Sequence, residues 1–143
     1  MALRDHAERE VREFHEFIEE WLTGRADRED YDRAEAVLPD DFEILSPTGD
    51  GRDGPTLRAD LRDGHGVFAD SDPPFEVRIA DLRTRDERES TCLVTYEEWQ
   101  RTDGDWEGRV STAFFRRAVD APNGVEWVHL HETWLPDDAE APA

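Results

Sequence analysis

Two short stretches in the C-terminal half of the sequence carry side chains capable of acid–base chemistry. His129 and His131 stand two residues apart in W-V-H-L-H-E-T-W, and Glu98 lies in T-Y-E-E-W-Q. Imidazole titrates near neutral pH, and an adjacent carboxylate fixes its tautomer. If His131 and Glu98 meet in a partly dry pocket, the pair can act as general acid and base. The alternative is a structural hydrogen bond inside a sheet, with Arg109 paired to a carboxylate.

The H-L-H spacing also raises the question of a metal site. Two histidines at i and i+2 of a strand share one face, and imidazole binds zinc, copper or nickel. A third ligand, such as Glu98, would be required from a neighbouring strand. Two histidines alone are a weak signal, so we predict no specific metal and no cofactor. His15 lies beside an apolar helical stripe and is interpreted as a boundary residue.

The N-terminal half of the chain is predicted to be mainly helical. Apolar residues recur at helical spacing from Leu3 to Leu22, which indicates a first helix ending at Gly24. Asp27 can cap a second helix that Pro39 stops. A short strand is predicted over 41–46, followed by turn residues, and a third helix starts near Pro55 and closes at Gly64.

The C-terminal half is predicted to be a four-stranded antiparallel meander. The expected strands cover 75–82, 91–100, 106–117 and 125–135. Asp103-Gly104 and Asn123-Gly124 mark two of the turns between them. Long strands twist enough to curl around the first helix. We therefore predict one α+β domain over residues 1–135, with residues 136–143 as a disordered acidic tail.

This order of elements resembles the NTF2-like superfamily, a cone-shaped fold shared by ketosteroid isomerases, SnoaL-like cyclases and DUF4440-type proteins. The cues are F-H-E-F-I-E-E-W-L-T-G in the first helix, F-E-I-L-S-P-T-G in the first strand, R-V-S-T-A-F-F in the meander and W-V-H-L-H-E-T-W-L in the last strand. The resemblance implies three N-terminal helices packed on a strongly curved antiparallel sheet. It names no reaction, because this superfamily includes enzymes and modules that only bind or assemble.

The resemblance also implies which strand faces line the cone. Trp127, His129, His131 and Thr133 share one face of the last strand by simple alternation, and that face is expected to be concave. The predicted site consists of His131 and Glu98 as catalytic residues and, as ligand-binding residues, Tyr96, Gln100, Arg109, Ser111, Trp127, His129 and Thr133. Together they would suit a small-molecule substrate with a carbonyl or carboxylate group.

The opposite faces of these strands carry an apolar surface that a monomer should not expose to water. Its members are Trp99, Val110, Phe114, Leu130 and Trp134. We therefore predict a homodimer formed through the convex sheet face. The function is predicted to be that of a cofactor-independent acid–base isomerase, cyclase or hydrolase. The alternative is a non-catalytic ligand-binding or dimeric assembly module.

The charge balance limits the class of partner and the compartment. The chain has 17 basic residues, all arginine, against 37 acidic residues, for a net charge of −20. In molar salt the screening length shrinks to about 3 Å, so we infer a cytoplasm rich in salt. A GC-rich genome is the alternative explanation for the excess of arginine. No basic stripe is present for nucleic acid or an anionic membrane, and no segment predicts a membrane span or signal peptide.

Overall fold

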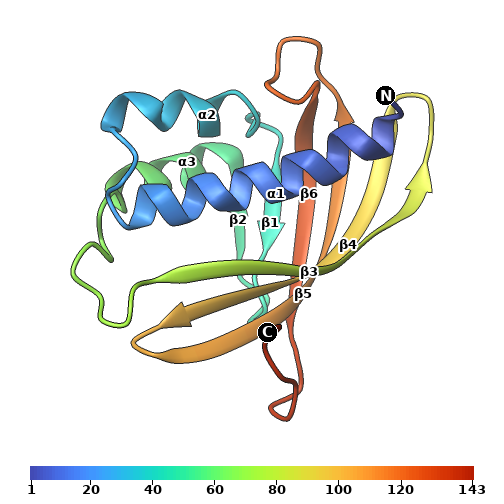
Figure 1. Ribbon diagram of the computed structural model, residues 1–143. Helices are drawn as coiled ribbons and strands as arrows, with labels where there is room; N and C mark the ends of the chain where they lie inside the picture. Colours follow the sequence, from blue (N-terminus) through green and yellow to red (C-terminus); the bar gives the residue numbers. More distant parts are fainter.

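The first helix lies across one face of a curved six-stranded sheet (Figure 1). The computed structural model describes residues 1–143, and its sheet order is β2-β1-β6-β5-β4-β3. The elements are α1 (Leu3–Leu22), a 3₁₀ turn η1 (Arg28–Tyr31), α2 (Asp32–Glu35), β1 (Glu43–Leu45), β2 (Gly51–Asp53), α3 (Gly54–Asp63), β3 (Glu76–Glu87), β4 (Thr91–Thr102), β5 (Asp105–Arg117) and β6 (Val125–Trp134).

Helix α1 follows the predicted apolar stripe. Leu3, Ala7, Val11, Phe14 and Trp21 are buried against the sheet. Burial of side chains of this size contributes roughly 1.5–3 kcal/mol each, so the stripe is the main reason that α1 packs where it does. No helix of the chain combines the length and apolar character needed to cross a membrane.

The second and third helical segments differ from each other in regularity. The segment predicted as one helix from Asp27 is instead a 3₁₀ turn followed by a single α-helical turn. The Asp30 carboxylate accepts a hydrogen bond from the Asp27 backbone N–H, at 3.0 Å, which stabilises the tight turn. Helix α3 begins as expected, because the Asp53 side chain accepts from the Thr56 N–H at 2.9 Å.

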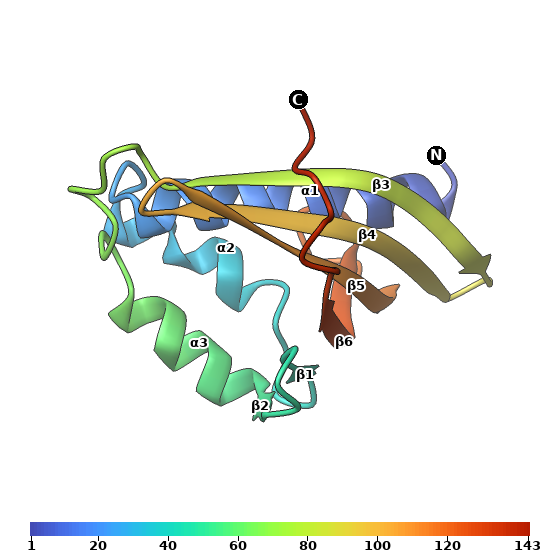
Figure 2. The same ribbon diagram turned by 90° about the horizontal axis from the view of Figure 1, so that it is seen from below.

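The four long strands form the predicted antiparallel meander, and Figure 2 shows their curvature around α1. Strand β1 pairs in parallel with β6, and β2 extends the sheet beyond it. The sequence analysis missed β2, because Gly51-Arg52-Asp53 has no alternation of apolar and polar side chains. The expectation of three helices on a curved, mainly antiparallel sheet is confirmed.

A β-bulge in β6 decides which side chains enter the interior. Phe114 pairs with His129, but Phe115 pairs with Trp127, so Val128 has no partner on β5. The extra residue reverses the alternation of all side chains that follow it. Trp127 is buried inside, as are Leu130 and Glu132 beyond the bulge, whereas the two histidines lie on the outer face.

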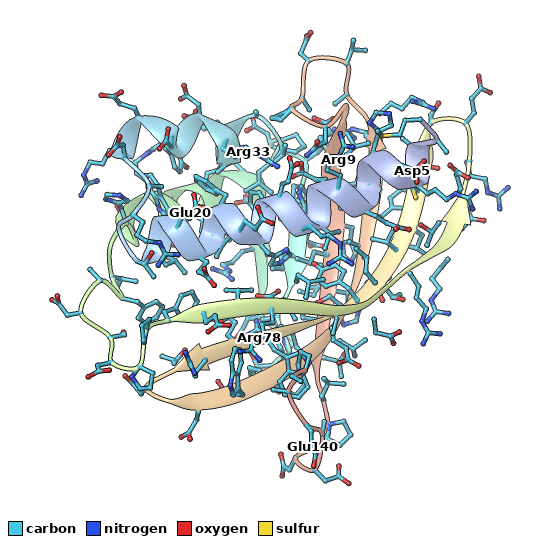
Figure 3. The ribbon with its side chains drawn as sticks, viewed as in Figure 1. Asp5, Arg9, Glu20, Arg33, Arg78 and Glu140 are labelled. Carbon is cyan, nitrogen blue, oxygen red and sulfur yellow. The ribbon has the colours of Figure 1, made fainter.

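The narrow part of the interior is filled by aromatic side chains around a fully buried carboxylate. Glu10 on α1 accepts hydrogen bonds from Arg33 (2.6 and 3.2 Å), Asn123 (3.0 Å) and the Trp127 indole (2.9 Å). Figure 3 shows Arg33 reaching from α2 toward α1. This network joins α1, α2, the β5–β6 turn and β6, and it leaves no oxygen of Glu10 without a partner.

Replacing Glu10 with glutamine is expected to destabilise the fold by about 3 kcal/mol, because the amide nitrogen would face donors and Arg33 would lose its counter-charge. The measurement is the free energy of unfolding by denaturant in molar KCl. Glu20→Gln, on the exposed side of the same helix, serves as the matched control. Equal stability of the two variants would contradict a structural role for the network.

Candidate functional site

A group of polar side chains lies on the concave face of the sheet, beside α1. We call it the interior cluster, and its members are His15, Tyr96, Glu98, Gln100, Arg109, Ser111 and Glu132. Strand pairing places Glu98 opposite Arg109 and places Ser111 between Tyr96 and Glu132. Four of its members, Tyr96, Glu98, Ser111 and Glu132, are at most 5% exposed. The cluster therefore extends across three neighbouring strands and one helix.

His15 and Glu98 form a buried ion pair at the helix side of the cluster. His15 Nε2 lies 3.1 Å from Glu98 Oε1, and His15 Nδ1 lies 2.7 Å from the Val11 carbonyl oxygen. Both partners are acceptors, so both ring nitrogens donate and the ring is an imidazolium. The amide of Gln100 donates to the other Glu98 oxygen at 2.5 Å. Both ring nitrogens of His15 and both carboxylate oxygens of Glu98 thus have hydrogen-bond partners.

The pKa shifts of the pair agree with this geometry. Burial alone would lower the pKa of His15, but the Glu98 charge and hydrogen bond outweigh it and raise that pKa above 6.5. Burial would raise the pKa of Glu98, but the charge and hydrogen bond of His15, with Arg109, lower it below 4.5. Both shifts therefore favour the ion pair over the neutral forms of the two side chains.

The neighbouring row of Tyr96, Ser111 and Glu132 differs from the ion pair, because some of its buried polar atoms lack hydrogen-bond partners. The Tyr96 hydroxyl, the Ser111 hydroxyl and the Arg109 Nε are buried, and none makes a hydrogen bond of regular geometry within the protein, although Ser111 is close enough to Tyr96 to oppose the rise of its pKa. Only one other buried side-chain atom of the chain, in Arg101, shares this property. Buried polar groups without partners are rare and cost roughly 1–3 kcal/mol each, so three in one row distinguish this part of the cluster from the ion pair.

Glu132 is the titratable group of this row. Both of its oxygens lie 3.4 Å from Arg109 Nη1, which is a long contact for an ion pair. Burial, and then repulsion from Glu98, raise the pKa of Glu132, while Arg109 opposes the shift. Burial, with the nearby charges of Glu98 and Glu132, also raises the pKa of Tyr96, which keeps its phenol protonated. The row thus combines one carboxyl group of raised pKa with two hydroxyl groups that lack partners.

A hollow between α1 and β3 reaches the cluster from its helix side. It has a volume of about 190 Å³, and its lining residues are Arg12, His15, Glu16, Glu19, Val77 and Ile79. The hollow ends at His15, whose far nitrogen contacts Glu98. It therefore connects solvent with the ion pair and not directly with the row of Tyr96, Ser111 and Glu132.

The structure brings together some of the residues predicted from the sequence and separates others. Tyr96, Glu98, Gln100, Arg109 and Ser111 lie together. Those predicted on β6 do not join them, and the expected pairing of His131 with Glu98 is wrong, since Glu98 binds His15.

The β-bulge at Val128 is the reason, because it turns His131 and Thr133, both exposed, to the outer face. His129 is also outside, with Nδ1 3.6 Å from a Glu43 oxygen. Trp127 is inside but belongs to the core network of Glu10. No group of three or more His, Cys, Asp or Glu side chains is arranged to hold a metal ion.

His15 and Glu132 are the functional candidates that sequence reasoning missed. His15 lies one helical turn after Val11 and three residues before Ile18, at the edge of the apolar stripe. This position could have indicated that its side chain contacts the sheet. Glu132 gave no signal, because regular alternation places it on the outer face. Leu130, expected on the convex surface, is in the core for the same reason.

Comparison with known proteins agrees with this fold. A family model described as "Sucrose-6-phosphate phosphohydrolase C-terminal" matches residues 7–136, which is most of the chain. The chain belongs to this family. No curated protein matches the sequence of this sucrose-6-phosphate phosphohydrolase C-terminal family member.

Solved structures similar to this family member are NTF2-like. An NTF2-like protein of unknown function from Pseudomonas aeruginosa is 23% identical with a TM-score of 0.80, over 92% of this chain and 99% of the other. An NTF2-like protein of unknown function in nutrient uptake from Rhodospirillum rubrum is 22% identical with a TM-score of 0.61, over 86% and 97%. The CaMKII hub of S. rosetta is 17% identical with a TM-score of 0.61, over 74% and 82%. These structures confirm the NTF2-like fold.

The ion pair of His15 and Glu98 should give this family member a distinctive pH dependence of stability. Because the pKa of His15 is raised on folding, its contribution is fully present below pH 6.5 and is lost as the pH rises through the folded value. Because the pKa of Glu98 is lowered, its contribution is present above pH 4.5 and is lost as the pH falls through the folded value. The pair is therefore most stabilising between pH 4.5 and 6.5.

The measurement is the difference in unfolding free energy between the wild-type protein and His15→Asn, followed from pH 5 to 9 in molar KCl. That difference should fall above pH 6.5 by at most about 1.4 kcal/mol per pH unit. His131→Asn removes an exposed histidine and should give no such slope. A flat difference for His15→Asn would show that folding leaves the pKa of His15 unchanged, and a difference that rises from pH 5 would show that the ring is neutral in the folded protein.

Proposed function

We propose that the interior cluster binds a small, uncharged molecule through a carbonyl or hydroxyl oxygen, and that Glu132 transfers a proton to or from it. The observation that carries the proposal is the set of three buried polar atoms without protein partners beside a carboxyl group of raised pKa. The class of activity is a cofactor-independent acid–base reaction, such as isomerisation. Tyr96 and Ser111 hold the oxygen of the substrate, and Glu132 acts at a neighbouring atom.

The charges of the cluster favour an uncharged ligand. Its two cations, His15 and Arg109, face two carboxyl groups, Glu98 and Glu132. A phosphate ester or carboxylate would therefore find no uncompensated positive charge. The free energy needed to remove it from water would exceed the free energy gained from its contacts with the cluster. For this reason a carbonyl compound fits better than a carboxylate, and the phosphohydrolase activity in the family name is not part of the proposal.

The proposed reaction needs only groups that the cluster contains. The Glu132 carboxylate removes a proton from a carbon that lies between the carbonyl group and a C=C bond of the substrate. The electron pair of the C–H bond forms a new C=C bond as the π pair of the carbonyl group moves to its oxygen. The hydroxyl groups of Tyr96 and Ser111 donate hydrogen bonds to the developing oxyanion. Return of the proton from Glu132 to the far carbon of the original C=C bond restores the carbonyl group and completes an isomerisation. A raised pKa brings the carboxyl group nearer to the operating pH, which favours transfer in both directions.

Tyr96→Phe and Ser111→Ala should separate binding from stability. Neither hydroxyl has a protein partner, so each removal should leave the unfolding free energy unchanged or raise it by about 1 kcal/mol. Affinity for a ligand found by thermal-shift screening of small carbonyl compounds should fall at least about tenfold in each variant. The measurements are denaturant unfolding and calorimetric titration.

Glu132→Gln completes this test, because it keeps the shape of the side chain but cannot transfer a proton. It should abolish turnover of the same compound while leaving its binding within a few-fold of the wild-type value. If the hydroxyl variants lose stability and keep full affinity, the hydroxyls serve the fold and the proposed site is wrong.

A second candidate function is assembly through the outer face of the sheet. Val110, 38% exposed, lies on the outer face of β5 opposite Glu97, and Phe114, four residues further along β5, pairs with Leu93. The similar solved structures include one described as a CaMKII hub and one described as a putative Ca/calmodulin-dependent kinase II association domain. We propose that this face pairs with a second copy of the chain, because apolar side chains in the centre of a sheet gain most from covering one another.

Val110→Asp should convert a dimer into a monomer, because a carboxylate would be buried in the contact without a counter-charge. Val119→Asp is the matched control: Val119 is 95% exposed and lies in the turn after β5. The measurement is sedimentation in molar KCl, which screens the repulsion between two chains of net charge −20. A wild-type protein that sediments as a monomer at all concentrations would exclude this second function.

A further inference from the structure

Aromatic side chains line a hollow near the C-terminal end of the chain. This tryptophan hollow has a volume of about 330 Å³ and is lined by three of the five tryptophans of the chain, Trp99, Trp106 and Trp134, together with Glu107 and Asp137. It lies where the β4–β5 hairpin meets the segment that follows β6. Arg109 of the interior cluster packs on Trp134, and Trp99 and Trp134 belong to the face predicted to form the dimer, but neither the proposed reaction nor the proposed contact at Val110 uses the hollow.

The C-terminal segment forms one wall of the tryptophan hollow. After β6 the chain turns back along the sheet, as Figures 1 and 2 show. The Pro142 carbonyl accepts a hydrogen bond from Arg78 of β3 at 2.5 Å. Residues 136–143, predicted to be a disordered tail, thus contribute Asp137 to the lining. Figure 3 labels Glu140 in the part of this segment that projects away from the sheet.

The position of Trp99 depends on a glycine on the neighbouring strand. A Cβ atom at residue 108 would lie 2.7 Å from the Trp99 ring, so only glycine allows the ring to lie flat on β5. The Trp99 indole N–H donates to Glu97 Oε1 at 3.0 Å, and this hydrogen bond holds the ring in its orientation. Trp99 is only 4% exposed, so the ring forms a preformed floor of the hollow.

The aromatic rings of this region already attract cations from within the protein. The Arg78 guanidinium lies 4.4 Å from the centre of the Trp106 ring, and Arg109 lies 4.9 Å from that of Trp134. Arg78 and Arg101, which lies 5.3 Å from the same Trp106 ring, share the Glu76 carboxylate at 2.8 and 3.1 Å, and Arg109 faces Glu132 at 3.4 Å. With Glu107 and Asp137 in the lining, the carboxylates around the hollow outnumber these three guanidiniums.

We propose that the tryptophan hollow binds an organic cation of the quaternary ammonium class. Indole rings attract a cation to their faces, and a tetraalkylammonium group has no N–H donors that need partners. Two carboxylates at the rim add long-range attraction for positive charge. K⁺ and other small ions prefer a shell of oxygen ligands, which a lining of indoles does not supply. The volume of the hollow suits a ligand of a few heavy atoms.

The proposal is tested by titrating the protein with choline in molar KCl and following its five indole N–H resonances by NMR. Signals of Trp106 and Trp134 should shift. Those of Trp21 and Trp127, which donate to Leu61 and Glu10 in the core, should stay in place. The neutral carbon analogue of choline, 3,3-dimethylbutan-1-ol, has the same shape without the charge. It should bind at least about tenfold more weakly.

Variants assign the binding to this hollow. Trp106→Leu should weaken choline binding about tenfold, and Asp137→Asn about threefold, whereas Asp138→Asn, one residue further along the segment, should leave it unchanged. Unshifted Trp21 and Trp127 signals in each variant show that the fold is retained. Equal affinity for choline and its neutral analogue, absence of any choline-dependent shift, or binding of sucrose in place of choline would each overturn the proposal.

Discussion

The buried carboxylate of Glu10 is the interaction on which the rest of the structure depends. A charge without contact with water must be compensated completely, and here one arginine, one amide and one indole do so from three different elements. These bonds fix the position of α1 relative to β6. Because His15 lies further along α1 and Glu132 further along β6, the same network sets the distance between the two sides of the interior cluster. A structural charge thus positions the candidate site.

The elements that local sequence determines could be predicted well. The stripe of α1 depends only on spacing along one helix. The turn after β4 was predictable because Asp103 and Gly104 adopt positive φ angles of 54° and 90°, which Asp-Gly tolerates. The break in the second helix and strand β2 escaped prediction, since one depends on a side-chain contact of Asp30 and the other only on pairing with β1.

The same distinction holds for the candidate site: contacts between regularly paired strands could be predicted, and contacts that depend on a bulge or on helix packing could not. Residues of β4 and β5 lie together because these strands pair without a bulge from Thr91 to Thr102, so simple alternation holds there. On β6 the register with β5 slips at Val128, and nothing in the alternating sequence from Trp127 to Glu132 reveals it. Whether His15 contacts the sheet depends on how α1 crosses it. Both outcomes are properties of paired elements, which a single strand or helix does not encode.

The distribution of charge separates the inside of this protein from its outside. The interior cluster balances two cations against two carboxyl groups, while the chain as a whole has a net charge of −20. Salt screens exposed charges but has little effect on buried pairs. The surface can therefore change its effective charge with the medium while the cluster keeps its electrostatic balance. The hydroxyls of Tyr96 and Ser111, which the fold itself does not use, remain available to a ligand under either condition.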